Sequence, residues 1–418
     1  MTVSNLEKLT DLVLNLPQPV DDMDHHFMLA PMQLGAGSAS TDSFAGLVDE
    51  FMAATQGGRS NRDKASLRRH WEYILLNLSK ALFSRRWLVV SLTSNAYTKD
   101  YWLKLFKLSH GATKAIVDYL DNEGLIVRKM GKQFKNGPLR TRLFPTEALA
   151  ARLWQFFLDS EHPITPPYLT IGEPEGKWRK IINKLDAKHP DHIDMTTIND
   201  FLKGHQWACK GPVRLIYKHT PFQSGRLYTP FQNLPDRSVR IRINTLIDGE
   251  PICEVDFSAN HLRLNLAVMA NEDAGGTPYE DIGELAAIDD RNKIKSFITV
   301  AMGASNRDEA MNACYKESID KQTFEAIESA ALERYPKLEL FTGWGLFAQN
   351  LEGTIIRNVM LKGVAEGIVA LPVHDAVAVQ QRHAQWAQDR MLEAWAEAVT
   401  ADGVVLAARS RLKIDYPD

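Results

Sequence analysis

The sequence predicts an α+β protein in which helical regions precede an antiparallel β-sheet with attached helices. An apolar, β-prone run at residues 251–255 leads directly into a helical pattern, as expected for a strand followed by a helix. Residues 368–379 place apolar segments on both sides of a short polar turn, which predicts a hairpin. The chain of 418 residues is too long for one ordinary hydrophobic core, so we expect two or three domains.

The composition is typical of a soluble globular protein, with 44% hydrophobic and 24% charged residues. Because the formal net charge is −3, contact with nucleic acid would require local basic patches. Cys209, Cys253 and Cys314 form no CxxC pair, so we expect reduced thiols and no zinc site. The absence of a signal-peptide pattern and of a long apolar run predicts a cytoplasmic protein with no membrane partner.

Residues 1–85 are predicted to form a helical N-terminal region. A Gly/Ala/Ser-rich run at 35–40 and a polar run at 56–60 indicate flexible linkers between the helices. A basic segment at 62–70 precedes apolar residues at helical spacing. We interpret its basic side chains as a solvated helix face.

Residues 101–146 predict two helices and then two strands. An amphipathic helix at 101–108 and a tight turn at 109–112 precede a second helix at 113–122. Strand patterns at 125–128 and 141–144 flank a basic turn.

This order resembles a winged helix-turn-helix, which we assign to residues 86–162. From Gly124 to Pro145 there are six basic residues and no acidic one. Such a wing would place Lys129, Lys132 and Lys135 along DNA phosphates, and Lys114 of the second helix at a major groove. Winged helices also dock proteins, but we favour DNA binding.

Residues 163–210 are predicted to be a linker with short helices. Apolar residues at 149–158 lie on one helical face before the Pro-rich run at 163–167, which marks a domain boundary. Short helices are expected at 178–185 and 195–202.

Asp256 stands where the apolar strand meets the helical pattern. An Asp in this position is more often a helix N-cap than a metal ligand, so other segments must decide its role. Three segments bear on it: residues 224–235, a basic helical pattern at 290–303, and the hairpin with His374 and Asp375 at its turn.

Together these segments resemble the palm and fingers of family A DNA polymerases and the related single-subunit phage RNA polymerases, over residues 211–418. The resemblance implies a right-hand palm with an antiparallel sheet and helical fingers. Residues 163–210 would then hold reduced thumb-like helices. The family's DYSQIELR motif resembles Asp256 through Arg263, and its HDE or HDS hairpin resembles His374 through Ala376.

The resemblance implies a catalytic role for Asp256 and Asp375, which would bind two Mg²⁺ ions, with Mn²⁺ as a substitute. Phosphoryl transfer onto a 3′-hydroxyl uses two divalent ions about 3.5–4 Å apart, and hard carboxylates suit Mg²⁺. The fingers helix resembles Arg291 to Gly303, which makes Arg291, Lys293 and Lys295 candidates to bind the nucleotide triphosphate.

Other candidates would contact the primer–template. The family's TGRLSS…NLQNIP run is similar to Ser224 through Pro235, which implies that Arg226 and Gln232 follow the minor groove. Arg263 and His374 are further expected nucleic-acid contacts. Residues 351–356 resemble the family's QGT-containing segment.

Several departures from the family pattern affect the expected activity. His261 replaces the Glu that excludes the ribose 2′-hydroxyl, so His261 is a candidate nucleotide contact and sugar choice is open. Ala376 replaces the motif's last acidic residue, and Met302 replaces the fingers aromatic. Lys293 and Lys295 compete for one triphosphate position because the spacing to Gly303 is one residue short.

The segment between the Pro-rich run and Arg226 is too short for a full thumb, which predicts low processivity. The absence of an acidic exonuclease set predicts no proofreading.

The predicted function is template-directed nucleotidyl transfer on a DNA primer–template, with dNTPs or rNTPs as substrates. A DNA-binding region ahead of a small polymerase suggests replication of a phage, plasmid or other mobile element. One alternative is a primase or single-subunit RNA polymerase. Another is a catalytically inactive DNA-binding initiator or regulator.

Overall fold

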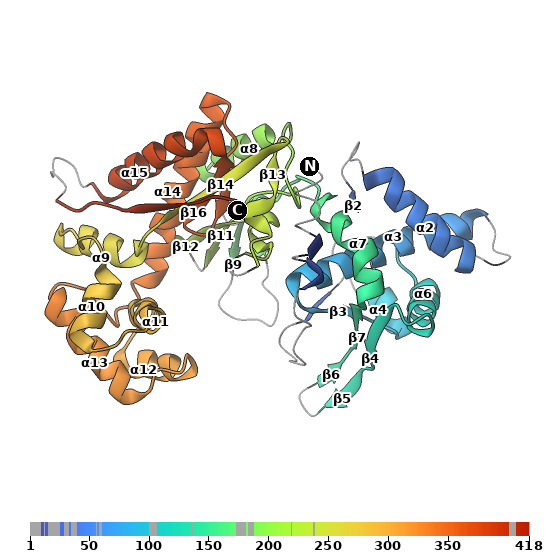
Figure 1. Ribbon diagram of the computed structural model, residues 1–418, viewed down its shortest axis with the longest axis horizontal. Helices are drawn as coiled ribbons and strands as arrows, with labels where there is room; N and C mark the ends of the chain where they lie inside the picture. Colours follow the sequence, from blue (N-terminus) through green and yellow to red (C-terminus); the bar gives the residue numbers. More distant parts are fainter. Residues whose placement is uncertain are drawn as a thin grey trace.

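We describe the protein from a computed structural model. The structure describes residues 10–11, 13–15, 26–28, 33–34, 40–55, 57, 61–99, 107–134, 137–172, 181–182, 188–218, 220–236, 239–400 and 407–417. Its elements form two groups that lie side by side, with the first part of the chain in blue to teal and the second in green to red (Figure 1).

The first group contains the helices α2 (Ser40–Thr55), α3 (Asn61–Ser84), α4 (Ser94–Lys99), α6 (His110–Asn122) and α7 (Glu147–Leu158). Its strands are β1 (His26–Met28), β2 (Gln33–Leu34), β3 (Trp87–Val90), β4 (Ile126–Lys129), β5 (Lys132–Phe134), β6 (Gly137–Leu139), β7 (Thr141–Pro145) and β8 (Ser160–Glu161). Helix α7 packs against α3, and the apolar face expected at 149–158 is buried as predicted.

Strand β7 lies between β3 and β4 and is antiparallel to both, while β5 and β6 form a separate two-stranded ribbon. The strands expected at 125–128 and 141–144 are confirmed, each displaced or extended by one residue. Burial stabilises this pairing, because all five residues of β7 are buried.

The helix before β4 begins earlier than predicted. Ser109 occupies the N-cap position, and its backbone N–H donates to Nε2 of the buried His70 at 2.7 Å. Helix α6 therefore starts at His110, and the tight turn expected at 109–112 is wrong. The helix expected at 101–108 falls mostly outside the described residues.

The segment expected to be a linker contributes two strands to a sheet of the second group. Strand β9 (Leu169–Gly172) lies between β10 (Ile181–Ile182) and β11 (Arg214–Lys218), and β12 (Thr220–Tyr228) completes the sheet. A helix expected at 178–185 is wrong at 181–182, because these residues pair with β9 instead. The helix expected at 195–202 is confirmed within α8 (Pro190–Leu202).

A second sheet carries the candidate site. Its strands are β13 (Leu246–Ile247), β14 (Glu250–Phe257), β15 (Leu371–Val373), β16 (Ala376–Gln380) and β17 (Leu412–Asp415). Strand β14 lies between β16 and β17, and every pairing in this sheet is antiparallel, as expected. The short helices η1 (Phe231–Asn233), η2 (Arg242–Asn244) and η3 (Gln381–His383) pack against its strands.

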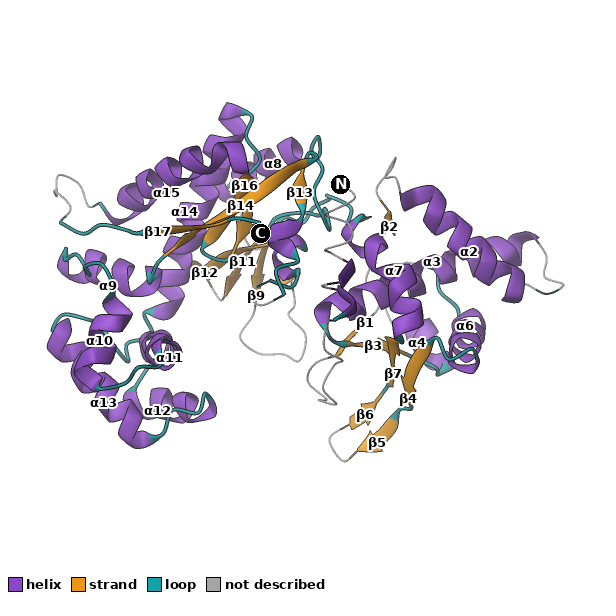
Figure 2. Ribbon diagram, viewed as in Figure 1, coloured by secondary structure: helices purple, strands orange, loops and turns teal. Residues whose placement is uncertain are grey.

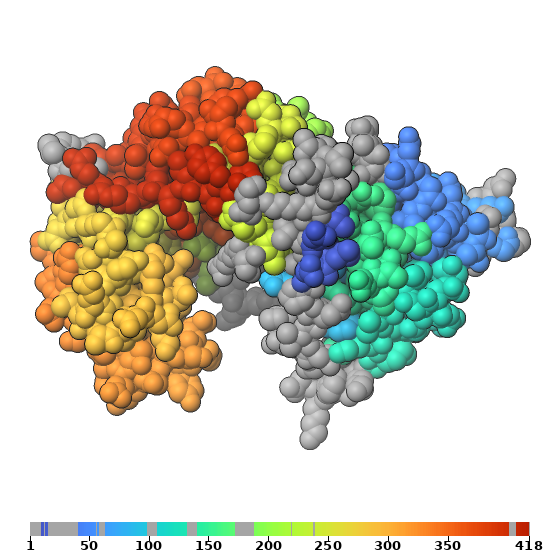
Figure 3. Space-filling model, viewed as in Figure 1, coloured from blue at the N-terminus to red at the C-terminus, as the bar shows by residue number. Residues whose placement is uncertain are grey.

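The remaining helices cover this sheet and extend from it (Figure 2). They are α9 (Asn260–Ala270), α10 (Pro278–Ala286), α11 (Arg291–Gly303), α12 (Arg307–Lys316), α13 (Lys321–Arg334), α14 (Gly345–Glu366) and α15 (Ala384–Val399). Helices α14 and α15 pack on each other and against the sheet. In the space-filling view, α10 to α13 stand apart from the teal elements of the first group along the lower edge (Figure 3).

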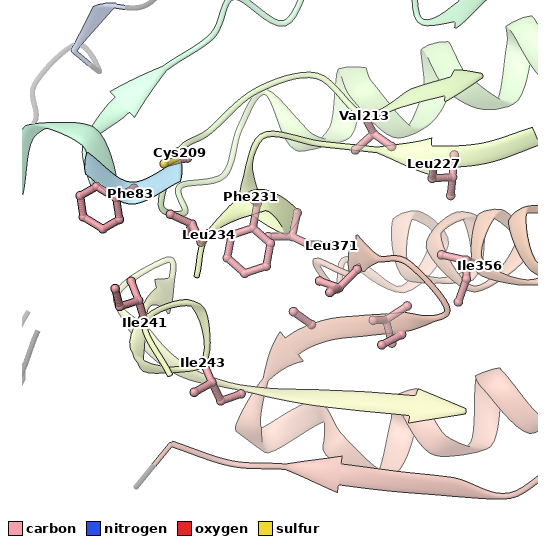
Figure 4. Packing of buried hydrophobic residues seen from close by; sticks show 14 of the residues in the cluster. Phe83, Cys209, Val213, Leu227, Phe231, Leu234, Ile241, Ile243, Ile356 and Leu371 are labelled. Atoms are coloured by element: carbon pink, nitrogen blue, oxygen red, sulfur yellow. The ribbon is translucent and has the colours of Figure 1, made fainter. Parts of the chain in front are cut away.

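Buried apolar side chains run from the first group into the second (Figure 4). Phe83 of α3 lies near Cys209, whose backbone N–H donates to Leu158 O at 2.7 Å. Phe231 continues the core toward Leu371 of β15. None of the helices in the described part of the chain combines the length and apolarity that a bilayer crossing requires.

Candidate active site

Asp256 and Asp375 are brought together by strand pairing. Asp256 lies in β14 directly opposite Ala376 of β16, and Asp375 immediately precedes Ala376. His374 and Asp375 form the two-residue turn between β15 and β16, and His374 has a φ of 57°. A positive φ at the first turn residue is found in the primed turns that join antiparallel strands. The hairpin thus presents Asp375 next to Asp256, near the end of β14.

Asp256 does not cap the following helix. Helix α9 begins at Asn260, and its N-cap position is held by Ala259 with φ 53° and ψ 39°. Asp256 lies within β14 instead, and 28% of its side chain is exposed. The helix-cap interpretation of this residue is therefore wrong.

Both aspartates open into one cavity of about 360 Å³. The cavity is lined by parts of β12, β14, α9, α10, α11, α14, β17 and the β15–β16 turn. The lining residues are Arg226, Asp256, Phe257, Ser258, Ala259, Asn260, His261, Tyr279, Arg291, Lys295, Thr299, Glu352, His374, Asp375 and Lys413.

One face of α11 forms the basic wall of this cavity. Arg291, Lys295 and Thr299 follow one another at four-residue spacing, which places them on the same helix face. The Arg291 Nε donates to Glu280 at 2.6 Å, and its guanidinium lies 5.1 Å from the ring centre of Tyr279.

Lys293 does not line the cavity, in contrast to the prediction. It lies two residues from Arg291 and therefore on another face of α11. Hydrogen bonds from Thr323 lower the pKa of Asp320, the N-cap residue of α13, and the charge of Lys293 adds a smaller contribution in the same direction. Of Lys293 and Lys295, which compete for one position in the prediction, only Lys295 lines the cavity.

Glu352 of α14 is the centre of a buried polar network in the cavity. Its Oε2 accepts from Arg226 at 3.1 Å, and its Oε1 accepts from Asn260 Nδ2 at 3.2 Å. His261 Nε2 lies 3.0 Å from the same Oε1 as an ion-pair contact, without the alignment of a hydrogen bond. Trp395 in turn donates to Asn260 Oδ1 at 3.2 Å.

The charges in this network stabilise one another. Burial alone would raise the pKa of Glu352, but His261 and Arg226 outweigh it and lower that pKa to about 2. Burial would lower the pKa of His261, but Glu352 raises it above its ordinary value. The His261 imidazole is therefore held beside a carboxylate supplied by another helix.

A close backbone contact fixes Glu352 in place. The next residue, Gly353, is where α14 crosses β12, and a Cβ there would lie 1.8 Å from Gly225 O. Gly225 has a φ of 76°, a conformation that favours glycine. Two glycines therefore allow the helix and strand to approach closely enough for Glu352 to reach Arg226.

The two aspartates are neutralised in different ways. Burial, with Glu352 and Asp256 nearby, raises the pKa of Asp375 to about 7. Asp256 Oδ2 lies 2.8 Å from Lys413 Nζ, which comes from β17. This contact raises the pKa of Lys413.

The donor set fits Mg²⁺ held jointly with a substrate. The part of the chain that the structure describes contains no group of three or more His, Cys, Asp or Glu side chains arranged for a metal ion. However, Mg²⁺ in nucleotide-using enzymes is commonly held by one or two carboxylates together with substrate phosphates and water. Asp256 and Asp375 supply such a pair of carboxylates beside a basic wall.

Several predicted contacts lie elsewhere. Arg263 is only 1% exposed and donates to the carbonyls of Ser258 at 2.8 Å and Gly276 at 3.0 Å, which does not fit contact with nucleic acid. Gln232 is 4% exposed in η1. Met302 of α11 is fully buried in the hydrophobic core and does not line the cavity.

The basic candidates of the first group are partly engaged within the protein. Lys114 pairs with Asp118 one turn later in α6, and Lys129 lies 4.6 Å above the Trp87 ring. Lys132 belongs to β5, but its side chain lies outside the described set, as does the whole of Lys135.

Sequence reasoning missed Glu352, Lys413 and Asn260 as site residues. Glu352 could have been noticed because it is a charged residue within the largely apolar helical pattern of residues 351–356. No local signal marks Lys413, because its place depends on the pairing of β17 with β14.

No protein-family model matches the chain, and no curated protein matches it. Among solved structures, the chain is similar to the POL domain of Pol1 from M. smegmatis in complex with DNA primer–template and dNTP. The identity is 14%, the match covers 97% of this chain and 80% of that chain, and the TM-score is 0.32. At this level the similarity carries no weight, so we base the function on the geometry of the site.

Proposed function

We propose that this chain is a template-directed nucleotidyltransferase that extends a nucleic-acid strand using two metal ions. The observation that carries the proposal is the register of β14 and β16, which sets Asp256 beside Asp375 in a cavity that Arg291 and Lys295 also line. Carboxylates and cations lining one cavity suit a substrate that is a metal-bound polyphosphate.

Each residue has a role in this proposal. Asp256 and Asp375 would hold Mg²⁺, which supplies charge neutralisation at the attacking and leaving oxygens when bound. Arg291 and Lys295 bind the triphosphate of the incoming nucleotide and hold it in place. Arg226 has a half-buried guanidinium at the cavity, where it orients Glu352 and borders the path of the primer–template.

The test is nucleotide incorporation by the full-length protein on a primed template with Mg²⁺. We expect Asp256→Asn and Asp375→Asn each to lower kcat by about 10²–10³-fold or more, the size seen when one preorganised electrostatic group is removed. Asp389→Asn, an exposed change on α15, is the matched control and should retain full activity. Incorporation that survives both site variants would refute the assignment of the site.

Two observations favour particular alternatives. His261 and its partner Glu352 line the cavity where the resemblance implies a single Glu, and this favours ribonucleotide use. Reactions with rNTPs test for RNA polymerase activity, and reactions without a primer test for primase activity. The Lys413–Asp256 ion pair favours an inactive DNA-binding initiator or regulator. Absence of incorporation in every arm would select that last alternative.

We further propose that residues 86–162 bind duplex DNA and recruit the enzyme to a replication start of a phage, plasmid or other mobile element. The helix α6 followed by two strands and a basic ribbon supports this role. We expect the double change Lys132→Gln and Lys135→Gln to weaken DNA binding and to reduce the salt slope by about 0.9 for each phosphate that the protein no longer neutralises. The change Lys337→Gln is the control for removal of an exposed charge. An unchanged affinity and slope would contradict DNA contact by the ribbon.

A further inference from the structure

Lys413 stands directly across the sheet from the candidate metal ligand. In the pairing of β14 with β17, Asp256 and Lys413 occupy opposite positions, and Lys413 Nζ lies 2.8 Å from Asp256 Oδ2. On its other side, Asp256 is paired with Ala376, next to Asp375. One neighbouring strand thus brings a carboxylate to Asp256, and the other brings a cation.

The position of Lys413 is fixed by the fold. Strand β17 pairs with β14 over four residues, and the Ser258 backbone N–H donates to Arg411 O at 2.8 Å. Arg240 binds both carboxylate oxygens of Asp415, at 3.0 and 3.2 Å. These contacts hold the two ends of β17, so the lysine between them is delivered to Asp256 by backbone pairing.

The Lys413–Asp256 pair differs from an ordinary surface ion pair because it lines the candidate active-site cavity. Most exposed pairs contribute little and have no further consequence. Here the carboxylate lines a cavity, and a divalent cation held by Asp256 would lie close to the Lys413 ammonium at the same carboxylate group. Like charges at that separation repel each other appreciably even in a solvated site. The ion and the lysine therefore compete for one ligand.

We propose that Lys413 is a resident counter-ion that competes with a divalent cation for Asp256. The inference rests on the proposed function, in which Asp256 binds metal. The Lys413 side chain is 69% exposed, so it is free to leave the carboxylate when the cation arrives. It then still lines the cavity that Arg291 and Lys295 also line, so it adds a third cation to the surroundings of the substrate phosphates.

The test measures direct binding of Mn²⁺ to the full-length protein without nucleotide. The electron paramagnetic resonance signal of the free ion reports how much Mn²⁺ is bound. We expect Lys413→Met to bind Mn²⁺ about tenfold more tightly than the wild type, because one like charge has been removed from the ligand. Lys413→Arg keeps the charge and should stay within about twofold of the wild type. Lys337→Gln removes an exposed, ion-paired lysine elsewhere and should leave the affinity unchanged. Matching urea midpoints would show that the Lys413 variants fold.

Asp256→Asn separates the two levels of the proposal. If Asp256→Asn abolishes Mn²⁺ binding but Lys413→Met does not tighten it, the counter-ion inference is overturned and the metal site stands. If neither the wild type nor Lys413→Met shows binding that depends on Asp256, the counter-ion inference fails together with the metal role of Asp256. Tighter binding by Lys413→Met that is abolished in the double variant with Asp256→Asn supports both.

Discussion

The change Gly353→Ala should disrupt both the fold and the site, because it places a methyl group between two backbones. The new Cβ would lie 1.8 Å from Gly225 O and 2.8 Å from Gly225 C. Real Cβ contacts are essentially never shorter than 3.0 Å, so α14 and β12 would have to separate by more than about 1 Å. No side-chain rotation can relieve the clash, since the opposing atoms belong to the backbone.

The size of the effect follows from this geometry. Added carbons in a packed core typically cost about 1–3 kcal/mol, and a contact against immovable backbone belongs at the upper end. We therefore expect the free energy of unfolding to fall by about 3 kcal/mol. The separation also draws Glu352 away from Arg226, so residual folded protein should show reduced nucleotide incorporation.

Urea unfolding followed by tryptophan fluorescence measures the change. Gly46→Ala is the matched control: Gly46 lies inside α2, and a Cβ there meets no atom within 4 Å. That variant should be stabilised by about 0.5–1 kcal/mol, as expected for Gly to Ala in a helix. If Gly353→Ala unfolded with the same free energy as the wild type, the close packing of α14 on β12 would be refuted.

Two further predictions concern charges in the cavity. The folded-state pKa of Glu352 is about 2, below its ordinary 4.5, so its contribution to stability is present above pH 4.5 and is lost as the pH falls toward 2. Glu352→Gln should therefore flatten the fall of Tm with acidification over that range, and an unchanged slope would contradict the network. Lys295→Gln should raise the KM for nucleotide about tenfold, because a charge-assisted hydrogen bond to the triphosphate is removed, whereas Lys293→Gln should leave it unchanged. Equal effects of the two lysine variants in steady-state kinetics would contradict the placement of α11.

The sequence was sufficient to predict the elements that depend on local patterns. Asp256 at the end of an apolar strand and Asp375 at a hairpin turn both follow from alternation and turn chemistry. Placing the two aspartates side by side requires one further piece of information, the register in which β14 pairs with β16. By the same reasoning, four-residue spacing already favours Lys295 over Lys293 as the partner of Arg291, because only the first shares its helix face.

Residues whose position depends on distant pairing could not be predicted in this way. Arg263 lies in α9, where most residues are buried. The helix therefore has no clear polar face in its sequence from which the burial of Arg263 could have been predicted. Glu352 reaches the site only because Gly353 and Gly225 allow close approach of two elements far apart in sequence. Lys413 reaches it through the pairing of β17, which no local pattern near the end of the chain specifies.

The three carboxylates of the cavity differ in how easily their countercharge can be exchanged, and this difference separates their roles. Glu352 is buried and bound by Arg226, Asn260 and His261, so replacing those partners would leave buried charges uncompensated. Asp256 is neutralised by an exposed lysine, and burial holds the pKa of Asp375 near 7, where a proton is readily lost. A lysine side chain and a proton can both give way to an incoming cation without disturbing the core. This difference supports the proposal that Glu352 orders the cavity and that the two aspartates bind an ion.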